Sequence, residues 1–171
     1  MKAQEKMEEA RFFLELLCWL ERECKTLTKR TVQDEATYLT SALMSAGYSV
    51  LEHLKVEILE EVERTDGEAG KIRVENKLGK SVNEFRRKHP EIGTRQRRIS
   101  VHYCSVPVER HTSGGGWGSS GFGERAFGSG GKVELRFSDP PQESVVTTFR
   151  TDIRELEQFI SDACERYLPK Q

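Results

Sequence analysis

Three arginines stand just ahead of one histidine and form the stretch of this sequence best suited to chemistry: Arg95, Arg97 and Arg98, then His102. An imidazole can take or give a proton near neutral pH. A guanidinium is a permanent cation whose planar fork fits phosphate oxygens. Together they would supply a base for an RNA 2′-hydroxyl and a cation for the charge that develops on phosphorus, without a metal ion. The alternative is an ordinary basic helix end with one exposed histidine.

The spacing indicates which arginines share a face with the histidine. In a regular helix that turns about 100° per residue, Arg95 and Arg98 lie within about 40° of His102, whereas Arg97 lies about 140° away. Arg97 then reaches the histidine only from a helix end or from a second copy of the chain. Two further candidate substrate-binding residues flank the histidine, and each has an ordinary alternative as a solvated or packed side chain: Ser100 and Tyr103.

Positive charge is concentrated around this stretch. Residues 71–98 carry ten Lys or Arg and three Asp or Glu, a net charge of +7, although the whole chain has a net charge of −1. An acidic stretch over residues 57–68 lies directly upstream. A local positive field can hold a polyanion even when the whole protein is near neutral. Alternatively, the basic stretch only pairs with its acidic neighbour. The charge pattern leaves both interpretations open.

Helical periodicity dominates the chain on both sides of the arginines. Apolar residues recur every three or four positions between caps and breakers. This pattern predicts helices over residues 3–27, 34–62, 71–88, 94–103 and 151–168. Residues that favour β-structure predict short strands over 104–109, 132–137 and 144–149.

The predicted fold is mainly α. We expect an antiparallel four- to five-helix bundle with a small β-hairpin or meander inserted before the C-terminal helix. The chain of 171 residues is long enough for one domain with a real core. Its predicted parts are a helical bundle core over 1–105, short strands over 104–150 and a last helix over 151–168.

Three single residues carry predictions about local structure. Asp34 is a good cap for the second helix. Gly47 in mid-helix costs about 1 kcal/mol relative to alanine, which predicts a packing reason for it. His89 precedes Pro90, so it is predicted at a helix end, where its charged form favours the helix dipole.

A glycine-rich loop separates two of the predicted strands. Nine of the nineteen residues over 113–131 are glycine, and three aromatic residues interrupt them. The sequence lacks the Gly-Lys-Ser/Thr ending of a phosphate-binding loop. One interpretation is a flap whose aromatic rings stack on RNA bases. The other interpretation is a mobile hairpin loop, which is favoured because the loop contains only one basic residue.

Other classes of protein fit the sequence poorly. No apolar run approaches the roughly 20 residues that span a bilayer, so no membrane partner is expected. The charged N-terminus does not resemble a signal peptide, which predicts a cytoplasmic protein. The four cysteines are scattered without a CxxC pair, so reduced thiols are expected. His102 and Cys104 lack a second ligand pair, so we expect neither a metal nor another cofactor.

The order of these features resembles the HEPN superfamily, the nucleotide-binding domains of higher eukaryotes and prokaryotes. The family motif is an arginine, four to six residues and a histidine, late in a helical bundle. Arg97 to His102 has the four-residue spacing and Arg95 to His102 has the six-residue spacing. Residues 38–51 also look like the second helix of some prokaryotic members. The resemblance covers roughly residues 5–105.

The resemblance implies a helical bundle that dimerises, with motifs from both protomers at one cleft. Active members are metal-independent endoribonucleases, often of toxin–antitoxin or defence systems. By analogy His102 would transfer the proton, and Arg97 would bind the scissile phosphate. Active members usually have Asn, Asp or His directly after the arginine, whereas this chain has Arg98.

Three interpretations of function therefore stay open. The first is an RNA-binding, metal-independent endoribonuclease that forms a homodimer. The second is an inactive member that binds RNA or a nucleotide, or that serves as partner of an antitoxin or of a nucleotidyltransferase. The third is a structural helical dimer in which the arginines pair with the acidic stretch.

Overall fold

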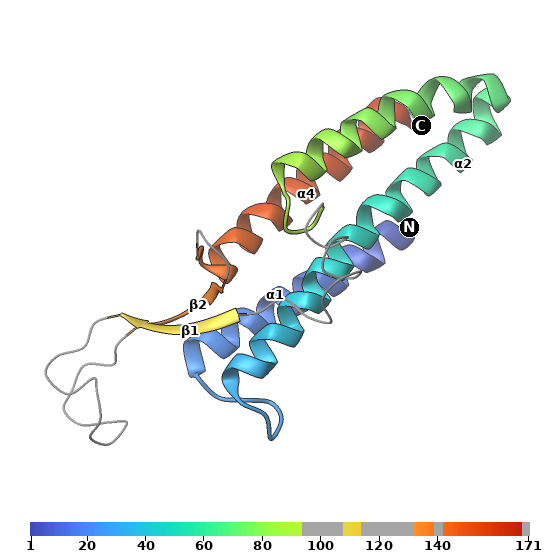
Figure 1. Ribbon diagram of the computed structural model, residues 1–171. Coiled ribbons are helices and arrows are strands. Elements are labelled where there is room, and N and C mark those ends of the chain that lie inside the picture. Colours follow the sequence, from blue (N-terminus) through green and yellow to red (C-terminus); the bar gives the residue numbers. More distant parts are fainter. Residues whose placement is uncertain (94–107, 114–131, 139–141, 169–171) are drawn as a thin grey trace, which may run out of the picture.

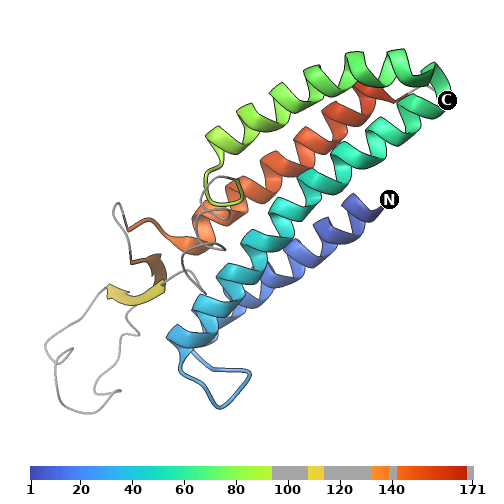
Figure 2. The same ribbon diagram turned by 45° about the vertical axis from the view of Figure 1, so that its right-hand side comes forward.

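The fold is mainly helical, with a small antiparallel sheet at one end (Figure 1). The computed structural model describes residues 1–93, 108–113, 132–138 and 142–168. Its helices are α1 (Lys2–Glu23), α2 (Val32–Lys88) and α4 (Val145–Tyr167). Its strands are β1 (Val108–Ser113) and β2 (Lys132–Phe137). In the turned view, α1 runs along the first part of α2, and α4 runs alongside both parts of α2 (Figure 2).

The number of helices differs from the four to five that the sequence predicts. The predicted helices over 34–62 and 71–88 are the two parts of α2, which is interrupted at Gly67 and turns back there. Gly67 has a φ of 71° and a ψ of −173°, a backbone conformation that residues with a Cβ rarely adopt. It divides α2 into a first arm (residues 32–66) and a second arm (residues 68–88). The predicted helix over 94–103 lies outside the described residues.

The start of α2 is fixed by a reciprocal cap. Thr31, not Asp34, is the cap residue, and its hydroxyl accepts from the Asp34 backbone N–H at 3.1 Å. Asp34 returns the contact, since its carboxylate accepts from the Thr31 backbone and hydroxyl. The helix α1 ends at Glu23 instead of the predicted residue 27, because Cys24 adopts a left-handed conformation with a φ of 52°.

Glu57 holds the start of α1 against α2, and Glu35 holds the loop that follows α1. The buried carboxylate of Glu35 accepts from the backbone N–H of Leu27 at 2.8 Å and of Thr28 at 2.5 Å. Glu57 accepts from the first backbone N–H groups of α1, at Lys2 and Ala3. No side chain of α1 itself caps these groups. Glu57 therefore supplies from the first arm the acceptors that the N-terminus of α1 requires.

The hydrophobic core lies between α1 and the first arm of α2 and extends under α4 and the sheet. Its largest fully buried side chains come from all of these elements: Met7, Leu17, Leu20, Leu43, Met44, Leu51, Leu54, Ile58, Leu78, Ile92, Leu135 and Phe149. Burying side chains of this size contributes about 1.5–3 kcal/mol each. The core therefore fixes the positions of the helix ends from which candidate functional residues extend.

The predicted small β-structure is present as a two-stranded antiparallel sheet. The register pairs Val108 with Phe137 and Ser113 with Lys132. The strand predicted over 132–137 is confirmed as β2, whereas the one predicted over 104–109 begins only at Val108 in the described residues. The Leu135 backbone N–H donates to a Glu21 carboxylate oxygen at 2.9 Å, which attaches the sheet to α1.

The strand predicted over 144–149 is wrong. These residues form the first turns of α4. Ser144 caps the N-terminus of this helix, because its hydroxyl accepts from the Thr147 backbone N–H at 3.3 Å. Valine and threonine favour strands locally, but the buried apolar residues here recur at helical spacing. Burial of that apolar stripe against the core outweighs the local preference. The stripe is Val145, Val146, Phe149, Ile153 and Leu156.

Among the described helices, none combines the length and the apolar character needed to cross a membrane. Even α2, the longest, carries charged residues along both arms.

Candidate functional site

Every residue that the sequence singles out for chemistry lies outside the described residues. They are Arg95, Arg97, Arg98, Ser100, His102 and Tyr103. Residues 114–131, nearly all of the predicted glycine-rich loop, also lie outside them. The structure does describe the chain on both sides of the Arg/His stretch, at Gly93 and at Val108. The structure therefore shows where the chain enters and leaves residues 94–107.

The chain enters this stretch from a tightly packed turn. Ile92 is fully buried, and a Cβ on Gly47 would lie only 2.9 Å from its Cγ2 atom. This contact explains the glycine in the middle of the first arm and confirms that it has a packing reason. Gly93 is equally close to the second arm, because a Cβ there would lie 2.6 Å from the Arg86 carbonyl oxygen. Neither position tolerates a larger side chain without movement.

The chain leaves the same stretch at a second buried point. Val108, the first residue of β1, is 1% exposed and belongs to the core. It pairs with Phe137, which packs edge-on against Phe149 of α4 at 6.0 Å between ring centres. Residues 94–107 are thus attached at both ends to buried parts of the molecule.

The last turn of α2, which leads into the stretch, is basic. It contains Arg86, Arg87 and Lys88. Arg86 pairs with Glu52 and lies over the Tyr48 ring, with its guanidinium carbon 4.4 Å from the ring centre. Arg87 and Lys88 are exposed and form no ion pair with a carboxylate of the described chain. They are free to contribute positive charge at the surface.

Near the Gly67 turn, by contrast, the basic stretch does pair with its acidic neighbour. Lys71 lies 2.8 Å from a Glu63 carboxylate oxygen, and Arg73 lies 3.5 Å from Asp66. The hydrogen bond to Glu63 raises the pKa of Lys71. The paired and the unpaired positive charges therefore lie in different places. Pairing accounts for the positive charge beside the turn, and unpaired charge gathers toward the end of α2.

A buried cluster joins the end of α2 to α4. The Nδ1 atom of His89 lies 2.8 Å from Asp152 Oδ1, and its Nε2 atom lies 3.0 Å from Glu155 Oε2. The ring stacks on Phe85 at 4.3 Å between centres. Burial raises the pKa of Asp152, and the hydrogen bond with His89 opposes that shift. His89 is at the helix end, as predicted, but it binds two carboxylates there.

The sequence argument missed Asp152 and Glu155. A signal for Asp152 was present, because it is an acidic residue within the apolar stripe of α4, next to Ile153. An acid on a buried face requires a partner. The sequence alone does not indicate that this partner is His89, which lies 63 positions away.

The described part of the chain contains no group of three or more His, Cys, Asp or Glu side chains that could hold a metal ion. The described cysteines are free thiols at Cys18, Cys24 and Cys164. Compared with protein-family models, curated proteins and solved structures, the chain matches none of them. A proposal for its function therefore rests on its own residues.

Proposed function

We propose that this chain is a HEPN-like RNA-binding protein that cleaves RNA without a metal ion. The observation that carries the proposal is the Arg/His motif, which begins at Arg95, seven positions after Lys88 in the basic last turn of α2. The mainly helical fold agrees with the fold that the HEPN resemblance implies. The unpaired Arg87 and Lys88 add positive charge on the approach to the motif.

In the proposed reaction, the His102 imidazole removes the proton from an RNA 2′-hydroxyl. The resulting oxygen attacks the adjacent phosphorus, and the bond to the 5′-oxygen breaks. Arg97, with Arg95 and Arg98, stabilises the extra negative charge on the phosphate oxygens. The leaving 5′-oxygen takes up a proton from water, so the products are a 2′,3′-cyclic phosphate and a 5′-hydroxyl. Ser100 and Tyr103 contribute to holding the RNA.

The proposal includes a homodimer, because motifs from two protomers at one cleft would let Arg97 act opposite the histidine of its partner. It also includes a cytoplasmic setting and a role in a toxin–antitoxin or defence system. No metal or organic cofactor is required for the step.

A second function is favoured by one specific residue. Arg98 stands where active HEPN members usually have a polar residue, so the same surface could bind RNA or a nucleotide without cleaving it. Such a protein would act as a partner of an antitoxin or a nucleotidyltransferase. The ion pairs beside Gly67 favour a structural role for that part of the basic stretch only.

An RNA cleavage assay in EDTA tests the proposal. The wild type is compared with His102→Ala, Arg97→Ala and the control His53→Ala, which changes a half-buried histidine of α2 outside the motif. We expect cleavage by the wild type and the control, with 2′,3′-cyclic phosphate ends, and a loss of at least about a hundredfold in His102→Ala. Full activity of His102→Ala would reject the assigned role. RNA binding without cleavage by the wild type would establish the second function instead.

A further inference from the structure

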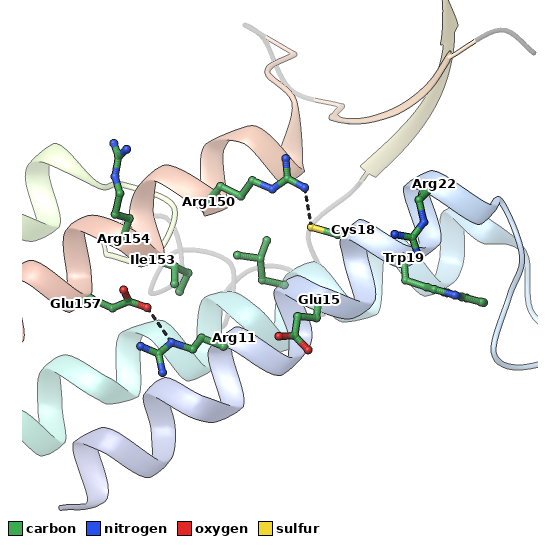
Figure 3. Close-up of a pocket in the computed structure, with 10 residues that line it drawn as sticks. Arg11, Glu15, Cys18, Trp19, Arg22, Arg150, Ile153, Arg154 and Glu157 are labelled. Atoms are coloured by element: carbon green, nitrogen blue, oxygen red, sulfur yellow. Dashed lines mark hydrogen bonds and ion pairs between the residues drawn. The ribbon is translucent and has the colours of Figure 1, made fainter.

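A groove with unusual charge lies between α1 and α4, on described residues only. Its volume is about 560 Å³. That size falls within the roughly 300–1,000 Å³ typical of small-molecule sites. Figure 3 shows Arg150 reaching from α4 toward Cys18 of α1, with Arg22 and Trp19 on α1 beyond the cysteine. The residues that give the groove its charge are Arg11, Arg22, Arg150, Arg154, Glu15 and Glu157.

Four of the five arginines of the two helices line this groove. Together α1 and α4 carry seven basic and eleven acidic residues, so both helices are acidic on average. Four of the seven basic residues line the groove, but only two of the eleven acidic ones do. A positive hollow between two acidic helices attracts a compact anion more than a long polyanion, which would have to cross the acidic surface.

Much of this positive charge is not neutralised. Arg11 is paired, because its Nε lies 2.8 Å from a Glu157 carboxylate oxygen and closes one end of the groove. Arg150 instead donates to the Cys18 sulfur at 3.3 Å. Neither Arg150 nor Arg154 forms an ion pair with a carboxylate in the described residues. Thiol sulfur is a weak acceptor, so an anionic oxygen would replace it favourably at Arg150.

The arginine side chains differ in their direction relative to the groove and in their ion pairs. Arg150 points across it, whereas Arg154 points away from α1 in the close-up (Figure 3). The Arg22 side chain is 73% exposed, and among the described residues it pairs only with its neighbour Glu23, at 2.8 Å. Exposed ion pairs of this kind are weak, so Arg22 can exchange its partner for a stronger anion. Arg150 and Arg22 are therefore the two cations best placed to bind one ligand.

The groove also offers an apolar, aromatic surface. Trp19 is half-buried, and Leu14 and Ile153 line the same groove. An indole face can stack on a planar base, and such stacking contributes about 1–3 kcal/mol per base. Phosphate-binding cations beside a stacking surface match the two chemical halves of a nucleotide.

We propose that the groove between α1 and α4 binds a nucleoside triphosphate, with the phosphates on Arg150 and Arg22 and the base on Trp19. This site is separate from the Arg/His motif and does not depend on the proposed RNA cleavage. A protein that cleaves no RNA could still bind the nucleotide, and the reverse also holds. The two proposals therefore stand or fall in different assays.

Isothermal titration calorimetry of the full chain with ATP and GTP tests the site. Arg150→Glu and Arg22→Glu are compared with the control Arg166→Glu, an exposed arginine of α4 outside the groove. We expect each groove variant to weaken binding by at least about tenfold and the control to change it by less than about twofold. Circular dichroism verifies that each variant is folded. All three side chains are exposed, so folding should survive.

Competitors identify the part of the ligand that is recognised. Inorganic triphosphate should compete more weakly than ATP, and adenosine should compete very weakly. In the Trp117→Phe background, ATP should quench the remaining fluorescence of Trp19. Absence of binding at millimolar nucleotide would overturn the proposal, as would equal loss in all three variants. A short RNA that binds in the groove more tightly than ATP would replace the nucleotide as the ligand.

Discussion

The Nδ1 atom of His89 lies 2.8 Å from Oδ1 of Asp152, and this contact joins two elements 63 positions apart in the sequence. His89 is 6% exposed and Asp152 is 5% exposed. The other carboxylate oxygen of Asp152 is buried and has no hydrogen-bond partner in the described structure. The pair therefore holds the end of α2 against α4.

We expect Asp152→Ala to destabilise the protein by about 1–3 kcal/mol, because it leaves the Nδ1 atom of a buried histidine without its partner. The double variant Asp152→Leu/His89→Phe should be more stable than Asp152→Ala, since it removes both polar partners at once. Urea unfolding followed by circular dichroism measures the free energy of unfolding of both variants. Asp162→Ala is the control, because Asp162 is an exposed acid of α4 that accepts from Gln158. A loss in Asp152→Ala no larger than in this control would contradict the expectation.

Helices were predicted best where local signals and burial agree. The period of apolar residues identified α1, both arms of α2 and most of α4, and the breaker Pro90 marked the end of the second arm. The prediction failed at residues 144–149, because Val and Thr favour strands locally while tertiary burial imposes the helix. The two helices predicted over 34–62 and 71–88 correspond to the two arms of α2, which Gly67 separates because its positive φ interrupts the helical backbone.

The candidate site was predictable only in part. The reason for Gly47 and the position of His89 at a helix end both followed from local rules, and the structure confirms them. The partners Ile92 and Asp152 did not follow, because contacts between distant parts of a chain depend on packing that no short pattern encodes. The roles of Arg97 and His102 stay predictions.

The buried carboxylate of Glu35 supports a prediction about pH. Burial alone would raise its pKa, but the hydrogen bonds from the Thr28 side chain and from the Leu27 and Thr28 backbones lower it overall. A lowered pKa means that the ionised form stabilises the folded state. That contribution is present above the pKa of an unfolded glutamate, about 4.3, and is lost as the pH falls through the lower folded value.

We therefore expect Glu35→Gln to lower the free energy of unfolding by about 1–2 kcal/mol at pH 7. The difference from the wild type should shrink steadily below about pH 4. Thermal unfolding at a series of pH values measures it. Glu61→Gln is the matched control, because the Arg64 hydrogen bond lowers the pKa of Glu61 too, but on the solvent-exposed surface. An equal effect of both variants, or a difference that grows toward low pH, would refute the assignment.

Two glycines of α2 form a matched pair for testing how the Arg/His stretch is anchored. A Cβ at Gly79 meets no atom within 4 Å, so Gly79→Ala should stabilise the helix by about 0.5–1 kcal/mol. The same change at Gly47 pushes on buried Ile92, and overpacking costs about 1–3 kcal/mol. Urea unfolding should therefore show opposite signs. Ile92→Ala should lower the free energy of unfolding less in the Gly47→Ala background than in the wild type. A stabilising Gly47→Ala would show that Ile92 yields freely and does not fix the chain at residue 93.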